Sequence, residues 1–300
     1  MLRNFAELKQ KVLANKEKKV IALACAADKH SLEALRDAHN EFGSDFLLIG
    51  DIHEIVAWAA NVGFQIDKKW LVQADTAEQA AEIAVESVRL GKADILMKGK
   101  MQTSDLLRAV VNKENGIRQG GLMSHLAVLE SPDYHKLMYI TDGGMVIGPS
   151  LEQKKGILEN AVSFLHKLGY EMPKAAALAA VETVNEKMPE TIDAKNLAVM
   201  SGAGEFEPHS CIVEGPMSFD LAISKESAKI KGIDSRISGD TDIFLAPDMA
   251  VGNILSKALI YLGNAKMAGC ILGAKAPIIL VSRGASAEEK MLSILLTMAV

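Results

Sequence analysis

The sequence predicts an α/β protein in which largely parallel sheets carry helices on both faces. Short apolar runs of strand length alternate with amphipathic segments of helix length along most of the 300 residues. Repeated strand, helix, strand units need crossover connections, and these favour parallel pairing. Aromatic residues make up only 5% of the chain, while alanine, isoleucine, leucine and 14 methionines supply most of its apolar side chains. This composition is typical of helices packed on a parallel sheet.

The predicted strands are short apolar runs. In chain order they are Val20–Ala26, Phe46–Ile49, Trp70–Val72, Ile95–Met97, Leu137–Thr141, Ala175–Val181, Cys211–Val213, Ile243–Ala246, Gly269–Leu272 and Pro277–Val281. Recognisable helix starts lie between them at Asp75–Glu78 and Ser150–Gln153, each followed by an amphipathic segment. Gly91 and Gly169 stand where these two helices should end.

The chain is long enough for two lobes that share a cleft or for one large α/β unit. Boundaries are predicted at the loop-rich stretch around Ser131–Asp133 and at Ala276–Pro277. The division we expect is a discontinuous first lobe of residues 1–130 plus 277–300 and a second lobe of residues 131–276, with the active site in the cleft between them. Ligands of such sheets bind beyond the carboxyl ends of the strands, so the residues just after each strand matter most.

Charge and hydropathy exclude several classes of function. The formal net charge of -5 offers no basic excess for a nucleic-acid partner. The longest apolar runs fall far below the ~18 residues of a membrane span. The N-terminal segment alternates apolar and charged residues at helical spacing, unlike the apolar core of a signal peptide. We therefore expect a soluble, cytoplasmic protein that binds neither nucleic acid nor membrane.

Cysteine and histidine spacings predict neither a disulfide frame nor a metal site. Cys25, Cys211 and Cys270 lie in or beside apolar stretches without C-x-x-C spacing. The 7 histidines include no H-E-x-x-H or H-x-x-x-H pattern. The segment Gly202-Ala203-Gly204 is not a dinucleotide loop, because position 207 is Glu and no clear strand precedes it. No metal and no nicotinamide cofactor are expected.

One group of candidate residues follows the last predicted strand, where Ser282-Arg283-Gly284 leads into a helix. An arginine at such a strand end presents a planar fork of donors that can hold a phosphate, although an ion pair would explain it equally well. A glycine turn followed by a helix start also directs free N–H groups toward an anion. Ser286 and Glu289 fit a capping box, and spacing alone favours this structural role for Glu289.

A second group follows the strand Ile95–Met97. Lys98, Lys100 and Arg108 supply cations around a glycine turn and a helix start near Thr103. The G-x-x-x-x-G-K-[ST] pattern of a nucleotide triphosphate loop is absent. An N-cap role for Thr103 or Ser104 and solvation of Lys100 would explain these residues without a ligand.

Two more loops follow predicted strands and open helices. They are Gly215-Pro216 and Pro247-Asp248, the latter with Asn253 downstream. Turn chemistry alone explains both loops without a function.

Four segments in order, MKGKMQTSDLLRAV, VEGPMSFDLA, DIFLAPDMAVGN and ILVSRGASAEE, resemble the phosphate acetyl/butyryl transferase family. The resemblance covers nearly the whole chain, and MKGK, GLMSHLAVLES and the compact length are similar to its butyryl branch. It implies a two-lobed fold like isocitrate and isopropylmalate dehydrogenases, usually dimeric. It also implies transfer of a short acyl group between coenzyme A and inorganic phosphate, both as substrates, with no permanently bound cofactor and no metal.

The resemblance also implies roles for residues. Ser282 and Arg283 match the family's catalytic pair, and Glu289 stands where acetyl-transferring relatives have an aspartate. We expect Glu289 to take the proton of the CoA thiol. Arg108 matches an arginine on the phosphate side, after the Thr-x-Asp helix start at Thr103.

Further substrate-binding candidates carry less specific signals. Since a second acyl-phosphate arginine has no clear match, Lys98 or Lys100 is expected to complete the anion site. The remaining candidates are Gly215, Pro216, Asp248 and Asn253.

Several alternatives stay open at this point. Acetyl or branched-chain acyl transfer fits the same residues, and a binding protein that senses CoA or acyl phosphate without turnover would need the same cleft. A dehydrogenase on the same fold would require a metal and a nicotinamide cofactor, for which the sequence offers no ligand cluster. Acyl chain length, physiological direction and oligomer size beyond a dimer do not follow from the sequence.

Overall fold

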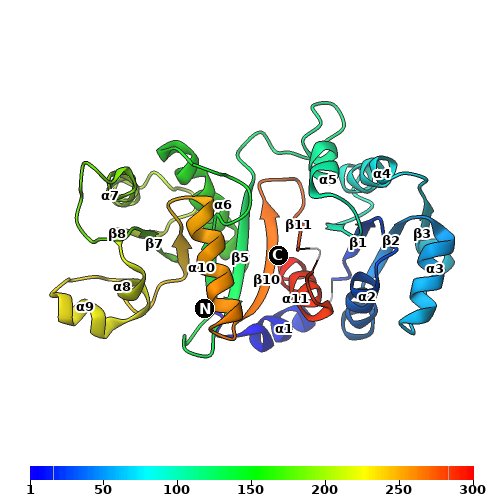
Figure 1. Ribbon diagram of the computed structural model, residues 1–300, viewed down its shortest axis with the longest axis horizontal. Helices are drawn as coiled ribbons and strands as arrows, with labels where there is room; N and C mark the ends of the chain where they lie inside the picture. Colours follow the sequence, from blue (N-terminus) through cyan, green and yellow to red (C-terminus); the bar gives the residue numbers. More distant parts are fainter. Residues whose placement is uncertain (16, 283) are drawn as a thin grey trace. The chain divides into compact units, whose positions relative to one another are not determined.

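A computed structural model describes residues 1–15, 17–282 and 284–300. These residues form two compact units, each built from alternating strands and helices (Figure 1). The first unit comprises Ala6–Gly121 and Ala268–Val300, and the second comprises Met1–Phe5 and Leu122–Met267. The predicted α/β class is confirmed.

The first unit contains strands that hydrogen-bond in the order β3-β2-β1-β4-β11-β10. All neighbours are parallel except β10 and β11. Its elements in chain order are α1 (Phe5–Ala14), β1 (Val20–Ala24), α2 (Lys29–Phe42), β2 (Asp45–Gly50), α3 (Ile52–Asn61), η1 (Lys68–Trp70), β3 (Leu71–Gln73), α4 (Ala77–Arg89), β4 (Ile95–Lys98), α5 (Thr103–Val110), β10 (Lys266–Leu272), β11 (Ile278–Ile279) and α11 (Ala287–Met298). Every residue of β4 is buried, so both faces of the sheet are covered here.

The C-terminal segment of the chain completes this unit. β11 pairs in parallel with β4, and the C-terminal helix α11 packs against α2. Figure 1 shows the red α11 beside the blue α2. The unit is therefore discontinuous in sequence, and residues near position 285 become neighbours of residues near position 30.

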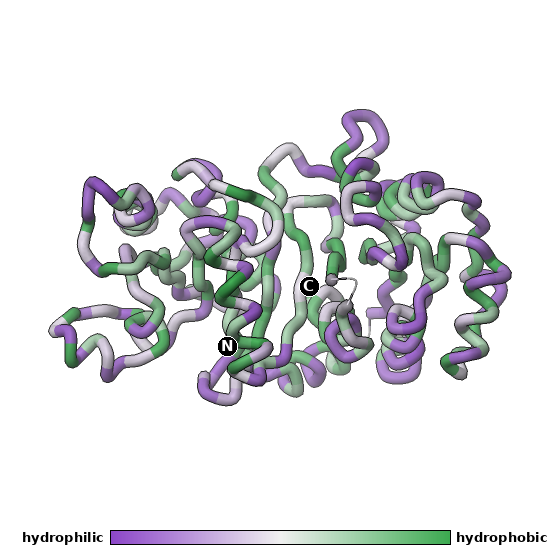
Figure 2. Tube along the Cα trace, viewed as in Figure 1, coloured by the Kyte–Doolittle hydropathy of each residue, from purple (hydrophilic) through white to green (hydrophobic). Residues whose placement is uncertain are grey.

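The second unit has the strand order β5-β6-β9-β7-β8, parallel except for β5 and β6. Its elements are β5 (Ser124–Glu130), β6 (Met138–Thr141), α6 (Leu151–Lys167), β7 (Lys174–Leu178), α7 (Pro189–Gly202), β8 (Ile212–Met217), α8 (Phe219–Ile223), α9 (Lys225–Lys231), β9 (Ile243–Leu245) and α10 (Met249–Tyr261). β6 and β9 are buried along their whole length. Figure 2 shows hydrophobic residues concentrated along the strands, whereas the loop after α5 is mostly hydrophilic.

The ends of α4 and α6 lie where capping residues and glycines predict them. Thr76 caps α4 by accepting a hydrogen bond from the Gln79 N–H, and Ser150 with Gln153 forms a complete capping box on α6. Gly91 and Gly169 adopt positive φ angles of 71° and 85° just after these helices. The local sequence therefore sets both ends of these helices.

The boundaries between the units differ from the predicted ones because one strand was missed. Residues 124–130 form β5, which pairs with β6 of the second unit, so the division falls after Gly121 rather than after residue 130. At the other boundary, β10 pairs with β11 of the first unit, which moves the division to Met267. The first residues also join the second unit, since the Phe5 N–H donates to Glu130 Oε2 at 2.6 Å.

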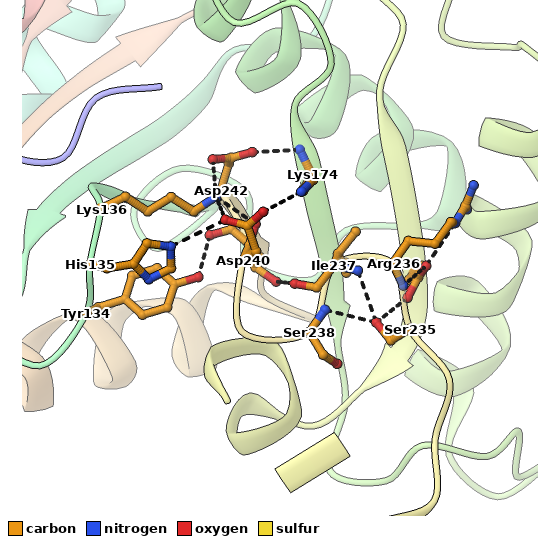
Figure 3. Close-up of polar contacts among 12 residues, drawn as sticks. Tyr134, His135, Lys136, Lys174, Ser235, Arg236, Ile237, Ser238, Asp240 and Asp242 are labelled. Atoms are coloured by element: carbon orange, nitrogen blue, oxygen red, sulfur yellow. Dashed lines mark hydrogen bonds and ion pairs between the residues drawn. The ribbon is translucent and has the colours of Figure 1, made fainter. Parts of the chain in front are cut away.

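A buried ion-pair network ties together the amino ends of β6, β7 and β9 (Figure 3). Lys136, only 1% exposed, places its Nζ 2.7 Å from Asp242 Oδ1 and 2.8 Å from Asp240 Oδ1. Lys174 also pairs with Asp240, and its backbone N–H donates to Asp242 at 2.9 Å. His135 Nε2 lies 3.3 Å from Asp240 at the exposed edge of the network. The network lies at the strand ends opposite to the edge where ligands of such sheets bind.

We predict that this network makes folding sensitive to acid through Asp240. Burial would raise the pKa of Asp240, but hydrogen bonds from Lys136 and Lys174 outweigh it and hold the pKa well below its ordinary value of 3.8. A depressed folded-state pKa contributes stability that is present above about pH 4 and is lost as pH falls below it. Urea unfolding between pH 7 and pH 2 should show this loss, and Asp240→Asn should flatten the acid part of the curve. An equal acid slope in both proteins would contradict the assignment.

Candidate functional site

A cavity of about 430 Å³ lies in the first unit at the carboxyl ends of β1 and β4. Its wall includes backbone and side chains of the loop between β4 and α5, the segment after β11 and the first turn of α11. The lining residues are Asp28, Ala77, Lys98, Gly99, Lys100, Met101, Gln102, Asp105, Val281, Ser282 and Lys290. Three of the predicted site residues, Lys98, Lys100 and Ser282, therefore meet at one place.

Gly99 allows the loop after β4 to cross the end of β1. A Cβ atom at this position would lie 2.2 Å from the carbonyl oxygen of Cys25, so only glycine fits. The Gly99 N–H donates to Ala24 O at 2.8 Å, and the Lys100 N–H donates to Cys25 O at 3.0 Å. This close approach positions the lysines on either side of Gly99 at the cavity.

Charged side chains of both signs line the cavity, namely the lysines Lys98, Lys100 and Lys290 and the aspartates Asp28 and Asp105. Lys98 is buried, and its Nζ donates to the carbonyls of Gly99 (3.3 Å) and Met101 (3.2 Å). Lys100 is exposed. α5 begins at Thr103, and Gln102 in the N-cap position makes no side-chain capping bond. The N-cap of α5 is therefore Gln102 rather than Thr103 or Ser104, and the first N–H groups of the helix lie beside the lysines.

A buried ion pair forms one wall of the cavity. Lys290 Nζ contacts the Asp28 carboxylate and donates to Ser31 Oγ at 2.9 Å. Although burial alone would raise it, the hydrogen bonds from Lys290 and Ser31 hold the pKa of Asp28 below its ordinary value. This ion pair joins the start of α11 to the start of α2, although its two residues are 262 positions apart in the sequence.

Ser282 and Glu289 both precede Lys290 in the sequence. Ser282 is exposed, and its Oγ accepts a hydrogen bond from the Gly284 N–H at 3.4 Å. Arg283 lies outside the described residues. Ser286 caps α11 by accepting from the Glu289 N–H at 3.1 Å. Thus the serine half of the predicted capping box is present.

The carboxylate of Glu289 differs from a capping group in its hydrogen bonding, its burial and its pKa. The reciprocal bond to the Ser286 N–H is not among the hydrogen bonds of the described residues, although α6 has both bonds of its box. The side chain is half-buried, and burial raises the pKa of Glu289 despite the opposing charge of Lys290. A partly desolvated carboxylate with a raised pKa is suited to general-base chemistry. Glu289 does not itself line the cavity; its neighbour Lys290 does.

Arg108 is not among the residues that line this cavity. It lies in a separate hollow of about 350 Å³ between α4 and α5, whose wall includes Glu78 and Asp105. Its side chain is 68% exposed, with Nη1 3.6 Å from Asp105 and 3.9 Å from Glu78. Arg108 lies three residues after Asp105 on α5, so the two side chains are neighbours on the helix face that borders this hollow. Asp105 lines both the cavity and the hollow.

The candidate residues of the second unit belong to two other hollows. Asp248 caps α10, accepting from the Val251 N–H at 2.9 Å, and lines a cavity of about 580 Å³. Gly215 and Pro216 line a smaller hollow of about 310 Å³. Asn253 lines neither, and its Nδ2 donates to the Gly143 carbonyl at 3.0 Å.

Gly215 has a packing role in addition to any role in binding. A Cβ atom there would lie 2.8 Å from the Ala177 Cβ and 3.0 Å from the Ala194 Cβ. The absence of a side chain therefore lets β8 approach β7 and α7 closely.

Comparison with known proteins assigns the chain to a family. Residues 72–298 match the family described as phosphate acetyl/butaryl transferase. The chain belongs to this family. Its sequence is 42% identical over 296 residues to the phosphate butyryltransferase of Clostridium acetobutylicum, covering 99% of this chain and 97% of the relative. It is 45% identical over 279 residues to the probable phosphate butyryltransferase of Bacillus subtilis, covering 93% and 92% of the two chains.

Solved structures agree with this family membership. The crystal structure of a branched-chain phosphotransacylase from Enterococcus faecalis superposes with a TM-score of 0.81 at 33% identity, covering 94% of this chain and 98% of that one. A 4-hydroxythreonine-4-phosphate dehydrogenase from Burkholderia phymatum shares the fold, with a TM-score of 0.54 at 13% identity, covering 94% and 97%. The predicted family and dehydrogenase-like fold are therefore confirmed.

Asp28 and Lys290 are two charged residues of this cavity that sequence reasoning missed. Asp28 follows β1, so the rule that ligand-binding residues come just after strands could have found it. Lys290 gives no such signal, because a lysine on a helix is almost always exposed. Within the described ranges, no helix combines the length and hydropathy needed to cross a membrane.

Proposed function

We propose that the chain acts as a phosphate butyryltransferase, converting butyryl-CoA and inorganic phosphate reversibly into butyryl phosphate and free CoA. The observation that carries the proposal is the match to butyryltransferases over nearly the whole chain. The cavity beside the start of α5 supports it, because the ammonium groups of Lys98 and Lys100 and the first N–H groups of a helix suit a phosphate group.

The proposed chemistry is direct attack without a covalent enzyme intermediate. A thiol with a pKa near ~8.5 is mostly protonated at neutral pH, so the CoA thiol needs a base when it attacks the carbonyl of butyryl phosphate. We assign Glu289 as this base, since its carboxylate is partly desolvated. The thiolate then adds to the carbonyl carbon, the bond to the phosphate oxygen breaks, and inorganic phosphate leaves.

The remaining residues are proposed to stabilise charge. Lys98, Lys100 and the guanidinium of Arg283 would hold the phosphoryl oxygens as negative charge develops on the leaving group. Ser282 at the cavity wall would donate a hydrogen bond to the sulfur or to the developing oxyanion. Arg108 is left out of this assignment because it faces the acidic hollow between α4 and α5.

We also propose that the protein is a cytoplasmic homodimer. CoA and phosphate are its substrates, and it holds no permanent cofactor. A second candidate function is acetyl or branched-chain acyl transfer, favoured by the similarity to a branched-chain phosphotransacylase. A sensor of CoA or acyl phosphate would bind the same molecules without turnover.

We predict that the purified protein releases free thiol from butyryl-CoA only when phosphate is present, and faster than from acetyl-CoA. Each buried methylene contributes about 0.8 kcal/mol, so two extra methylenes should raise kcat/KM severalfold if both are desolvated. A thiol-reagent assay over straight and branched acyl-CoAs measures this directly. Better activity with acetyl-CoA or isobutyryl-CoA would reassign the substrate, and binding without turnover would favour the sensor.

A further inference from the structure

The helix α10 of the second unit, drawn in orange in Figure 1, is apolar on two faces. Lys257 is the one charged residue among its 13. The inner face packs on the core of the unit, where Gly252 and Ser256 are buried and Leu259 contacts the core side chains. A helix that is apolar all round is normally buried on every side, so the outer face of α10 needs a partner of its own.

The outer face of α10 carries a continuous apolar stripe. Its members follow one another at steps of three and four residues, the spacing that places side chains on one side of a helix. Ile254 is 67% exposed, Tyr261 is 78% exposed and Leu262 is 85% exposed. A contiguous exposed apolar surface of this kind marks an interaction site, whereas single exposed apolar residues do not. The members of this outer stripe are Val251, Ile254, Leu255, Ala258, Tyr261 and Leu262.

The two ends of the outer stripe are complementary in shape. At the C-terminal end, Tyr261 and Leu262 are its most exposed side chains. At the N-terminal end, Val251 and Leu255 line the cavity of about 580 Å³. Ten residues of helix place Val251 and Tyr261 about 15 Å apart. The stripe therefore joins a projection at one end to a hollow at the other.

The cavity at the N-terminal end presents mainly carbon atoms. Two of its three charged residues are engaged within the unit, because Lys154 pairs with Asp193 at 2.7 Å and Asp248 accepts a hydrogen bond from the Val251 N–H. An apolar side chain that enters this cavity would leave water without displacing either of these contacts. Beside Val251 and Leu255, the apolar part of the wall comes from Leu178, Pro189, Phe219 and Pro247.

We infer that the outer stripe is the surface through which two copies of the chain associate, with α10 packed antiparallel against α10 of the second copy about a two-fold axis. Tyr261 and Leu262 of each copy then lie at the apolar cavity beside Val251 of the other. The inference names the surface of the homodimer proposed above and does not depend on the acyl-transfer chemistry.

Self-complementarity is the reason to assign a second copy to this surface. In a two-fold interface each contact occurs twice, so a projection and a cavity on the same helix fill one another in both directions. A small molecule in the cavity would leave Tyr261, about 15 Å away, in water. A helix that lies on a membrane carries many lysines and arginines on its polar face, whereas α10 has only Lys257.

The size and charge of the surface also suit a dimer. A stable interface takes roughly 800 Å² from each copy, with a centre that is depleted of charged residues. The stripe runs along a helix about 20 Å long and supplies such a centre. Ile147, which is 76% exposed, extends it at the N-terminal end, since its carbonyl accepts a hydrogen bond from the Met249 N–H at 3.1 Å.

Ile254→Glu tests the inference, because it places a carboxylate from each copy in the apolar centre of the interface. Sedimentation equilibrium over a wide concentration range should show a dimer for the wild-type chain and a dimer dissociation constant at least about 100-fold higher for the variant. The circular dichroism spectrum should stay that of the wild type, since Ile254 is exposed in the single chain. The matched control is Ile230→Glu on α9, where the isoleucine is 77% exposed outside the stripe, and it should remain a dimer.

A disulfide trap tests the antiparallel arrangement. The double variant Val251→Cys with Tyr261→Cys should form a covalent dimer on mild oxidation, whereas neither single variant should. The two thiols cannot meet within one chain, because the helix holds them about 15 Å apart and a disulfide needs Cα atoms within about 7 Å.

Each outcome separates this inference from the other proposals. The inference is overturned if Ile254→Glu stays as dimeric as the wild type, if Ile230→Glu dissociates equally, or if the double cysteine variant forms no covalent dimer. A dimer that survives Ile254→Glu leaves the homodimer standing on another surface, and a monomeric wild-type chain refutes the homodimer as well. A wild-type dimer that passes these tests but releases no thiol from butyryl-CoA refutes only the proposed acyl transfer.

Discussion

Replacing Glu289 with glutamine should slow acyl transfer from butyryl phosphate to CoA by about 10²–10⁴-fold, the usual effect of removing a positioned general base. Glutamine keeps the size of the side chain and the backbone N–H that Ser286 caps. Burial raises the pKa of Glu289, so its charged form is disfavoured in the folded state and its removal should not lower the melting temperature. A loss of rate without a loss of stability separates catalysis from helix capping.

The pH dependence provides a further check on Glu289. Because burial raises its pKa above the ordinary value of 4.5, the rate of the wild-type enzyme should fall on the acid side at a pH above that value. This acid limb should disappear in the slow Glu289→Gln enzyme. Glu288→Gln, one residue earlier in the same exposed turn of α11, is the control and should change neither rate nor limb. Normal turnover by Glu289→Gln across neutral pH would leave the base to be sought elsewhere.

Replacing Lys136 with methionine should destabilise the second unit by about 3–5 kcal/mol, the usual cost of leaving a buried charge without its partner. Lys136 is 1% exposed, and Asp242 beside it is 4% exposed, so water cannot replace the lost ammonium group. Urea unfolding monitored by circular dichroism measures the change. Lys195→Met, at an exposed lysine on α7 of the same unit, should change stability by less than about 0.5 kcal/mol.

A double variant identifies the mechanism of this loss. Lys136→Met combined with Asp242→Asn removes the unpaired charge and should recover part of the stability that the single variant loses. If the single variant costs no more than the exposed control, the network does not hold the amino ends of β6, β7 and β9 together. If the double variant is worse by the full sum of its parts, charge pairing is not the cause.

The sequence alone determined the α/β class, nearly all the strands and the ends of several helices, because these depend on local patterns. The capping box at Ser150 and the glycine stop at Gly169 each depend on residues that are close together in the sequence. The family could be inferred from the order of four segments, and Lys98, Lys100 and Ser282 could be selected from their places after strands, since all three line one cavity.

The tertiary structure decided what depends on contacts between distant parts of the chain. The strand β5 was missed because its apolar run is recognised as a strand only through antiparallel pairing with β6. The buried pair of Lys290 and Asp28 joins residues 262 positions apart, and the side of α5 on which Arg108 lies depends on where α4 packs. Local propensity carries no information about such partners, because burial and charge pairing are set only when the chain has folded back on itself.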